Sequence, residues 1–597
     1  MSRVDDDDDL TGPTGELPAH WLADLARVDG PSAEYAPPRT DAERLLATIW
    51  QEVLGVDRVG IDDDYFELGG DSVHAIVVVA RAQERGCHLE PDQLLAGRTV
   101  RVVAARAAPV PAGYDTEATD TDGEHPLTAL QQGMLYHAVG GSTPGAYVVQ
   151  VSCRLTGDLD HTAFDDAWQA VFDANPVLRT VVTWRGGASA RQRVVAGLRM
   201  PLRLLDHRGM EPSDREQSFA HLLDSDRQDG FDLETGPLMR LTVVAERERE
   251  HRCVWTYHHL ILDGWSQQLV LRDVFDCYRR LRAGKPPSPR RRPPFLDYLD
   301  PLRDTVREGD GFWARRFADL TQATRIAGPG CVDGQVTTSG RPITELTVPA
   351  PVAGTLTDLA GAYGITAAAV VHAAWALLLG LRTGTWDTVH GVTLAGRPPH
   401  LPGVTESIGM FVNTLPLRVS TSPEATVLDW LHDVQARLSE VRQRQHDALS
   451  DIERQVGLAH GTGLFDSIVV VENYPTWIGA GDEVAGLRVD RLSVVVEEGY
   501  PLVLEYAPGT EPVLRARFDD RRLDRPTVDG ILAVLAVTIS AAVTDPGQRL
   551  AALAGTAHAA WDRSREDQRQ ALRDGAAHRL GTTRRRTVSG IGVDADA

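Results

Sequence analysis

The apolar residues of this 597-residue chain fall into short periodic segments separated by polar and Pro/Gly-rich stretches. Residues 252–257 are rich in aromatic and β-branched side chains and contain no Gly or Pro, which predicts a strand. From Ser266 to Leu281 the apolar residues recur at close to helical spacing, which predicts a helix. The sequence His-His-Leu-Ile-Leu-Asp-Gly at 258–264 therefore lies in the turn between a strand and a helix.

This turn carries the strongest candidate chemistry. A strand end that is fixed by its sheet presents a side chain into a cleft with little positional freedom. Because successive strand residues point to opposite faces, one of His258 and His259 can face a cleft while the other packs. Taken singly, each histidine is explained as a structural residue, and Asp263 with Gly264 as a turn and helix N-cap. The combined spacing His-His-x-x-x-Asp-Gly instead predicts an active site.

A second pattern near the N-terminus predicts a small helical domain. Thr40 to Glu43 form a capping box that begins a helix, and Gly55 ends it. Another apolar helix begins at Ser72, directly after Leu-Gly-Gly-Asp, and further short helices are expected over 91–95 and 100–106. Without this context, Asp71 or Ser72 would simply be an N-cap.

The remaining segments define the domain organisation. Residues 1–38 combine an Asp run with Gly and Pro and are expected to be disordered, with a short docking helix as the alternative. Residues 108–124 have no apolar period and read as a linker. Mixed helices and strands, among them strands near 391–394 and 464–472, suit two similar α/β lobes over 125–297 and 298–550. Residues 551–597 are predicted to be helix-prone and then disordered.

Composition excludes several classes of function. The formal net charge of −23 argues against nucleic acid as a partner. The five cysteines lie far apart and indicate neither a disulfide framework nor a metal site. Lys285 is the only lysine, so a Gly-Lys-Ser/Thr phosphate loop is absent and ATP chemistry must occur elsewhere. No run of eighteen apolar residues and no apolar N-terminal segment are present, so a cytoplasmic protein without membrane contact is expected.

The motifs resemble two families that work together. Residues 258–264 resemble the signature of the condensation domains of nonribosomal peptide synthetases, which share their fold with chloramphenicol acetyltransferase-like enzymes. Further segments resemble other motifs of that family: 127–137, 175–180, 295–299, 408–419 and 464–474. Residues 68–72 and the helices around them resemble a peptidyl carrier domain. The resemblance implies a four-helix-type carrier domain over 39–107, followed by a condensation domain of two α/β (α+β) lobes with the active site between them.

The resemblance to carrier domains also implies a cofactor. In that family the motif serine carries 4′-phosphopantetheine, so Ser72 is expected to hold it, with Gly70 and Asp71 belonging to the same site. Glycines allow a phosphopantetheinyl transferase to approach the backbone, and a helix N-terminus favours the phosphodiester. An adenylation domain and an acceptor carrier protein would have to come from neighbouring modules or other chains.

The resemblance to condensation domains assigns roles around the histidine turn. His259 is implied to be catalytic, either as a base or as a hydrogen-bond partner that orients the nucleophile. His258 and Asp263 would shape the loop, and Gly264 would leave room for the tethered substrates. Arg179 is implied to pair with Asp263, with an ordinary surface arginine as the alternative.

The expected reaction is amide formation between a donor thioester on Ser72 and an acceptor amine, usually on another carrier protein. Residues 127–137 resemble the version of their motif that accepts D-configured donors. Three alternatives remain open: release of the acyl group onto a free amine or alcohol, epimerisation of a loaded amino acid, and an inactive platform that recruits partner enzymes.

Overall fold

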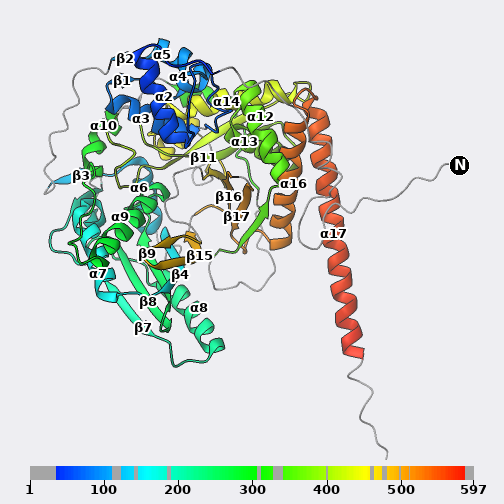
Figure 1. Cartoon of the computed structure of the whole chain (residues 1–597). Coiled ribbons are helices and arrows are strands. Elements are labelled where there is room, and N and C mark those ends of the chain that lie inside the picture. Colours follow the sequence, from blue (N-terminus) through cyan, green and yellow to red (C-terminus); the bar gives the residue numbers. More distant parts are fainter. Residues whose placement is uncertain are drawn as a thin grey trace, which may run out of the picture.

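The computed structural model describes residues 35–70, 72–109, 123–139, 146–184, 190–304, 311–326, 341–398, 401–457, 463–472, 481–496, 499–509 and 511–584. A small helical domain sits on a larger body that contains two six-stranded sheets (Figure 1). The predictions for residues 1–34, for most of the linker, for Asp71 and for the Arg-rich end of the tail lie outside the described residues.

The N-terminal domain has the predicted helices. Its elements are α2 (Asp41–Leu54), α3 (Ser72–Glu84), β1 (Cys87–His88), α4 (Pro91–Gly97), α5 (Val100–Arg106) and β2 (Ala108–Pro109). The capping box is confirmed, because the Thr40 hydroxyl accepts from the Glu43 N–H and the Glu43 carboxylate accepts from the Thr40 N–H at 2.9 Å. Gly55 ends α2 in the left-handed conformation that a side chain would disfavour.

The first lobe is built on a sheet of order β14-β15-β4-β9-β8-β7. Helices α7 and α9 pack together on one side, while Phe219 of α8 packs with Val244 and Val254 on the other. The predicted strand before His259 is confirmed as β9, and the predicted helix after it as α9. The elements are β4 (Val148–Gly157), β7 (Leu202–Asp206), β8 (Met239–Arg247), β9 (Glu250–His258), β14 (Glu483–Val484), β15 (Leu487–Val496), α7 (His161–Ala174), α8 (Pro212–Asp229) and α9 (Gly264–Arg282).

Shorter elements surround this sheet and connect it to the second lobe. A three-stranded sheet has the order β3-β6-β5. The elements concerned are β3 (Glu124–Pro126), α6 (Ala129–Val139), η1 (Pro176–Arg179), β5 (Thr180–Thr183), β6 (Arg191–Val194), η2 (Phe295–Tyr298), α10 (Leu299–Asp304) and α11 (Phe312–Arg316).

The second lobe has the sheet order β10-β17-β16-β13-β11-β12. The strand predicted near 391–394 is confirmed as the end of β11, and the strand predicted over 464–472 is confirmed only over the shorter β13. Its strands are β10 (Ile343–Thr347), β11 (Asp387–Leu394), β12 (Asn413–Ser420), β13 (Ser467–Val471), β16 (Leu502–Ala507) and β17 (Val513–Phe518). Its helices are α12 (Ala350–Tyr363), α13 (Ala367–Thr383), α14 (Val427–Arg442), α15 (Leu449–Val456), α16 (Arg525–Thr544) and α17 (Leu550–Arg584).

One part of the predicted division at residue 297 is wrong. Strand β15, from the C-terminal half of the chain, pairs antiparallel with β4 in the first lobe, with Leu487 opposite Gly157 and Val496 opposite Val149. The alternating burial of β15 suits a strand of that sheet with one face buried and the other exposed. The two lobes are therefore joined by a crossing segment as well as by the chain between them.

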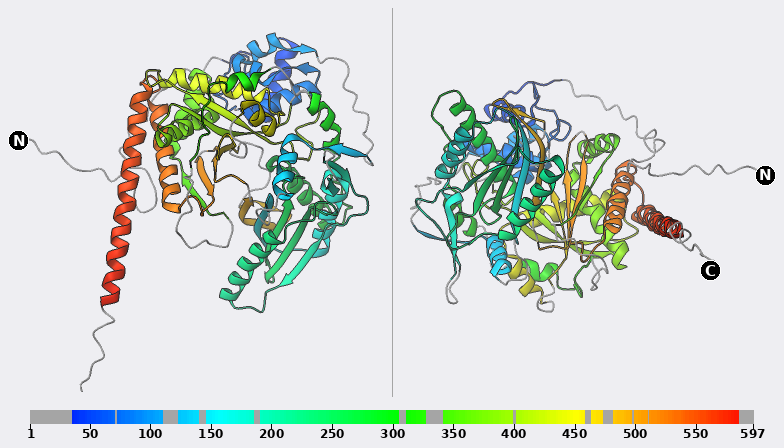
Figure 2. Two further views of the ribbon diagram at one scale, coloured as in Figure 1. Left: turned by 180° about the vertical axis from the view of Figure 1, so that it is seen from behind. Right: turned by 90° about the horizontal axis from the view of Figure 1, so that it is seen from below.

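Helix α16 is long and apolar enough to cross a membrane by composition alone, and it is the only such single helix in the described part of the chain. The apolar composition of α16 is explained by its place in the core, because 67% of the apolar window is buried inside the second lobe. Helix α17 lies against α16 and then projects beyond the body (Figure 2).

The helical domain touches both lobes. Ala360 of α12 is buried in the core of the helical domain, and a Cβ added at the neighbouring Gly361 would lie 3.0 Å from Glu67 Cγ. On the other side, Val77 of α3 packs against the core of the first lobe. The domain thus rests where the two lobes meet, beside α10 and α14 in Figure 1.

Candidate active site between the lobes

The two histidines at the end of β9 have different surroundings. The backbone N–H groups of His258 and His259 donate to Leu238 O and Tyr147 O, at 2.9 and 2.8 Å. His258 is buried, and its Nδ1 accepts from the Leu260 N–H at 3.2 Å. Burial, with a smaller contribution from His259, lowers the pKa of His258 to about 3. His258 is therefore a neutral packing residue of the turn.

His259 is half-buried and faces a chamber between the lobes. Its Nδ1 lies 2.7 Å from Leu262 O. Because a carbonyl oxygen only accepts, Nδ1 must carry the ring proton, and Nε2 is left with a free lone pair. The turn itself thus sets the tautomer of His259: Nδ1 carries the proton that is donated to Leu262 O, and Nε2 is the basic nitrogen.

Asp263 is fully buried and joins the two lobes. Its carboxylate accepts the Ser266 N–H at 2.7 Å, so it caps α9 as the local pattern predicts. It also accepts the Phe411 N–H at 3.1 Å, and both oxygens lie 3.2 Å from Nη2 of Arg397. Arg397 is itself fully buried, and its guanidinium lies 4.1 Å from the centroid of the Phe411 ring.

The predicted pairing of Arg179 with Asp263 is wrong. Arg179 lies at the end of η1, and its Nη2 donates to the Asp173 carbonyl at the end of α7, at 3.2 Å. Asp263 is instead enclosed by the segment that follows β11, which brings Arg397 from 134 residues away. Local spacing offers no sign of this partner. The one signal is an arginine three residues after the end of a buried strand, since a buried arginine needs a carboxylate.

The segment 404–411 of the second lobe is fastened to the start of α9. Ser266 Oγ donates to Gly409 O at 2.8 Å and accepts the Gly409 N–H at 3.0 Å. Trp265 Nε1 donates to Thr405 O at 3.0 Å. Only glycine fits at 409, because a Cβ there would lie 2.3 Å from the Phe295 ring.

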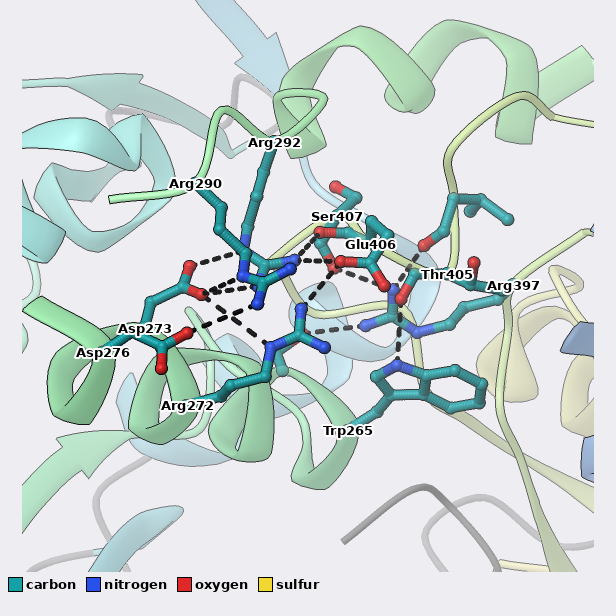
Figure 3. A network of polar contacts seen from close by, with 12 residues as sticks. Trp265, Arg272, Asp273, Asp276, Arg290, Arg292, Arg397, Thr405, Glu406 and Ser407 are labelled. Carbon is teal, nitrogen blue, oxygen red and sulfur yellow. Dashed lines mark hydrogen bonds and ion pairs between the residues drawn. The ribbon is translucent and has the colours of Figure 1, made fainter. Parts of the chain in front are cut away.

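A network of charges extends this attachment along α9 (Figure 3). Arg292 binds Asp273 through two contacts of 2.7 and 2.8 Å and Glu406 at 2.6 Å, and Arg272 reaches Glu406 at 2.8 Å. Burial alone would raise the pKa of Glu406, but the two guanidinium groups outweigh it and the pKa lies below its usual value. The 404–411 segment is thereby held in one position against α9.

The chamber has a volume of about 550 Å³. Residues of all three bodies line it: His259 and Trp265 from the first lobe, strands β11 and β13 from the second, and Ile76 from α3 of the helical domain. Gln131 Nε2 of α6 donates to Leu260 O at 2.8 Å and so supports the histidine turn from the side. Leu130 and Val412 line both the chamber and a second pocket of about 670 Å³, so the two hollows adjoin at these side chains.

The carrier motif lies close to this chamber. Ser72 is the first residue of α3 and stands four residues, or roughly 6 Å along the helix axis, before Ile76. Gly69 has a left-handed φ of 88°, and a Cβ at Gly70 would lie 2.5 Å from the Tyr65 ring. Glycine at position 69 is therefore favoured by the backbone conformation, and glycine at position 70 by the close packing of the Tyr65 ring.

These residues fit a phosphopantetheine group. The start of a 13-residue helix offers backbone N–H groups and the positive end of the helix dipole to a phosphodiester.

No metal site is expected from the sequence, and no group of three or more metal-ligating side chains occurs among the described residues. The described cysteines, Cys87, Cys153, Cys253 and Cys277, are free thiols, and Cys331 lies outside the described residues.

Fold and site together define a class: a small carrier domain joined to a mixed α/β domain that holds a histidine turn in a chamber between two sheets. The chain belongs to the condensation-domain family, since residues 121–559 match the model described as "Condensation domain". Residues 44–107 match the model described as "Phosphopantetheine attachment site".

Curated relatives are multi-module synthetases. The chain is 34% identical over 438 residues to one of the linear gramicidin synthase proteins of Brevibacillus parabrevis, a match that covers 72% of this chain and 6% of that protein. It is 32% identical over 451 residues to chondramide synthase cmdD of Chondromyces crocatus, covering 68% of this chain and 11% of that protein. The chain thus spans only a small part of the length of these relatives.

Solved structures share the fold. The first condensation domain of the calcium-dependent antibiotic synthetase superposes with a TM-score of 0.60 at 18% identity, covering 72% of this chain and 99% of that one. The X-domain from teicoplanin biosynthesis gives a TM-score of 0.61 at 23% identity, covering 73% and 98%.

Proposed function

We propose that this chain is a carrier–condensation segment of a nonribosomal peptide synthetase in which Ser72 carries the donor acyl or peptidyl thioester. The condensation domain joins that acyl group to an acceptor amine, usually an aminoacyl thioester on another carrier protein. The observation that carries the proposal is that Ile76 of the carrier helix and His259 of the condensation domain line one chamber. A group attached at the start of α3, one helical turn from Ile76, could therefore reach the histidine through this chamber.

In the reaction, the amine nitrogen forms a bond to the thioester carbonyl carbon, the C–S bond breaks, and the amine loses a proton as the thiol leaves. Phosphopantetheine on Ser72 would supply the thiol that holds the donor. The contribution of His259 follows from its tautomer: Nε2 can accept a hydrogen bond from the amine N–H and then its proton. The Leu262 carbonyl, which accepts from Nδ1, stabilises the positive charge that this proton brings to the ring.

The other site residues support this position. Asp263 and Arg397 hold the turn between the lobes, and His258 packs beneath it as a neutral ring. Gly264 lines the chamber, where the lack of a side chain leaves room for the substrates. Under this proposal, residues 39–107 act as the carrier, and an adenylation domain, an acceptor carrier protein and a phosphopantetheinyl transferase come from elsewhere.

We further propose that the terminal residue of the donor is D-configured or achiral, because 127–137 resemble the motif version that accepts D-donors. L-alanyl, D-alanyl and glycyl groups loaded on Ser72 test this. Efficient condensation of the L-alanyl donor alone would contradict it.

The central test has two parts. Treatment with a phosphopantetheinyl transferase and coenzyme A should add the cofactor mass to the intact chain, and Ser72→Ala should abolish the addition. The loaded chain, mixed with a loaded acceptor carrier protein, should then form an amide that His259→Ala loses. Three other results would select the alternatives: α-proton exchange without amide formation, transfer to free amines or alcohols, or product formation that His259→Ala leaves unchanged.

A further inference from the structure

Two histidines outside every recognised motif meet beside the chamber. His372 of α13 and His390 of β11 have ring centroids 5.2 Å apart and planes inclined by 17°. His372 Nδ1 lies 2.9 Å from His390 Nε2. Both side chains are buried, so this contact is a hydrogen bond between two enclosed imidazoles.

Both rings are neutral near pH 7. Burial lowers the pKa of His372 to about 3. Burial, and then repulsion from His372 when that ring is protonated, lowers the pKa of His390 well below its usual value. Each neutral ring carries a single N–H, so one ring must donate in the contact and the other must accept.

The surroundings of His390 decide which ring donates. His390 Nδ1 is buried without a hydrogen-bond partner. If His372 donated, His390 would have to carry its proton on this enclosed Nδ1, and a buried N–H without an acceptor is strongly disfavoured. His390 therefore donates from Nε2 to His372 Nδ1, and the proton of His372 resides on its Nε2.

This proton faces the chamber. His372 lines it among apolar neighbours, including Ala368 one turn earlier on α13 and Val392 and Ile468 on the adjoining strands. Within the described part of the chain, the only hydrogen bond of His372 is the one to His390. At this point the chamber wall thus presents an oriented N–H donor between apolar side chains, and such a donor distinguishes ligands by whether they offer an acceptor there.

We propose that His372 Nε2–H is a specificity-determining donor that binds an oxygen acceptor, a carbonyl or a hydroxyl, of the group held in the chamber. His390 is a positioning residue that fixes the tautomer of His372. The inference rests on the proposed function and deepens it. The acceptor oxygen can belong to a substrate side chain or to an amide carbonyl of the pantetheine arm.

The test compares donors that differ in oxygen. Asparaginyl and leucyl donors are nearly isosteric, and only the first offers a side-chain carbonyl. Expected for His372→Phe is a tenfold or greater loss of kcat/KM with the asparaginyl donor and less than a threefold change with the leucyl donor. His372→Gln keeps an N–H donor and should restore most of the loss. His390→Phe should lower the asparaginyl-to-leucyl ratio without removing the activity with the leucyl donor.

A second arm separates the two sources of oxygen. If the pantetheine arm is the ligand, His372→Phe should slow both donors tethered to Ser72 but spare the same donors presented as N-acetylcysteamine thioesters. An equal loss for every donor in both presentations, or no change at all, would overturn the proposal.

Binding must be measured as well, because it does not depend on the reaction. Calorimetry on the whole His259→Ala chain, with an unreactive amide analogue of asparaginyl-pantetheine, should show affinity at least tenfold weaker when His372→Phe is added. Loss of this contrast would refute the role of His372. An unaltered contrast in binding, together with no amide formation by the chain that keeps His259, would instead refute the proposed function alone.

Discussion

Asp263 of the first lobe and Arg397 of the second are both fully buried, with Nη2 of the arginine 3.2 Å from each carboxylate oxygen. The same carboxylate caps α9 and accepts the N–H of Phe411. The position of His259 therefore depends on a contact between segments 134 residues apart.

Removing the arginine should disable the turn. Arg397→Ala leaves a buried carboxylate without its charge partner, which costs roughly 3–5 kcal/mol of folding free energy. We expect a lower urea midpoint and loss of amide formation. Arg179→Ala is the matched control, and we expect a change of less than about 1 kcal/mol because its contact is a single bond to a carbonyl. Equal effects of the two substitutions would contradict the assignment of Arg397.

The charge network on α9 gives a second comparison. Arg292 is 2% exposed and binds Asp273 and Glu406, whereas Arg290 is 56% exposed and contacts Asp273 at 3.6 Å. Arg292→Ala should destabilise the fold by about 3 kcal/mol, and Arg290→Ala by no more than about 0.5 kcal/mol. Thermal unfolding of both variants measures this. A similar melting temperature for both would show that the network does not hold the 404–411 segment.

The buried histidines predict a loss of stability in mild acid. The pKa values of His258 and His372 fall from 6.5 to about 3 on folding, so the unfolded chain binds protons first as the pH decreases. The stabilisation is present above pH 6.5 and is lost between pH 6.5 and about 3. Between pH 7 and pH 5 each ring should account for roughly 2 kcal/mol.

Urea unfolding at pH 7 and pH 5 measures this loss. The double variant His372→Phe/His390→Phe removes two of the titrating rings while keeping aromatic volume, so its stability should depend less on pH than that of the wild type. An unchanged dependence would mean that these rings do not titrate on unfolding.

The contact between the carrier domain and α12 can be tested with two substitutions on that helix. Gly361 of α12 faces Glu67 of the carrier domain, whereas a Cβ at Gly354, on the same helix, would meet nothing within 4 Å. Gly361→Phe should displace the carrier and slow transfer from Ser72 by tenfold or more. Transfer from a free N-acetylcysteamine thioester should be unchanged.

Gly354→Phe is the control for this experiment and should leave both reactions unchanged. If the Gly361→Phe variant also transferred its tethered donor at the normal rate, the carrier domain would not occupy this position on α12 when it transfers the donor.

The sequence predicts features that short segments determine. The capping box at Thr40 and the strand–turn–helix around His259 depend on neighbouring residues, and both are found. The tautomer of His259 also follows from its own turn, through Leu262.

Features that depend on distant contacts were missed. Arg397 contacts Asp263 across 134 residues of sequence, and nothing near Arg179 shows that its side chain donates to the Asp173 carbonyl instead. His372 and His390 carry no motif, and they meet because α13 packs on β11. The periodicity of a sequence does not predict which polar side chains are buried or which distant residues they contact.

The pairing of β15 with β4 has a consequence for synthesis on the ribosome. Until residues 487–496 emerge, the sheet of the first lobe must end at β4, whose backbone then remains an open edge. More than three hundred residues separate these strands in the sequence, so the first lobe cannot be completed during translation as an independent unit. A nascent chain halted before residue 487 should therefore show an unfinished, protease-sensitive first lobe.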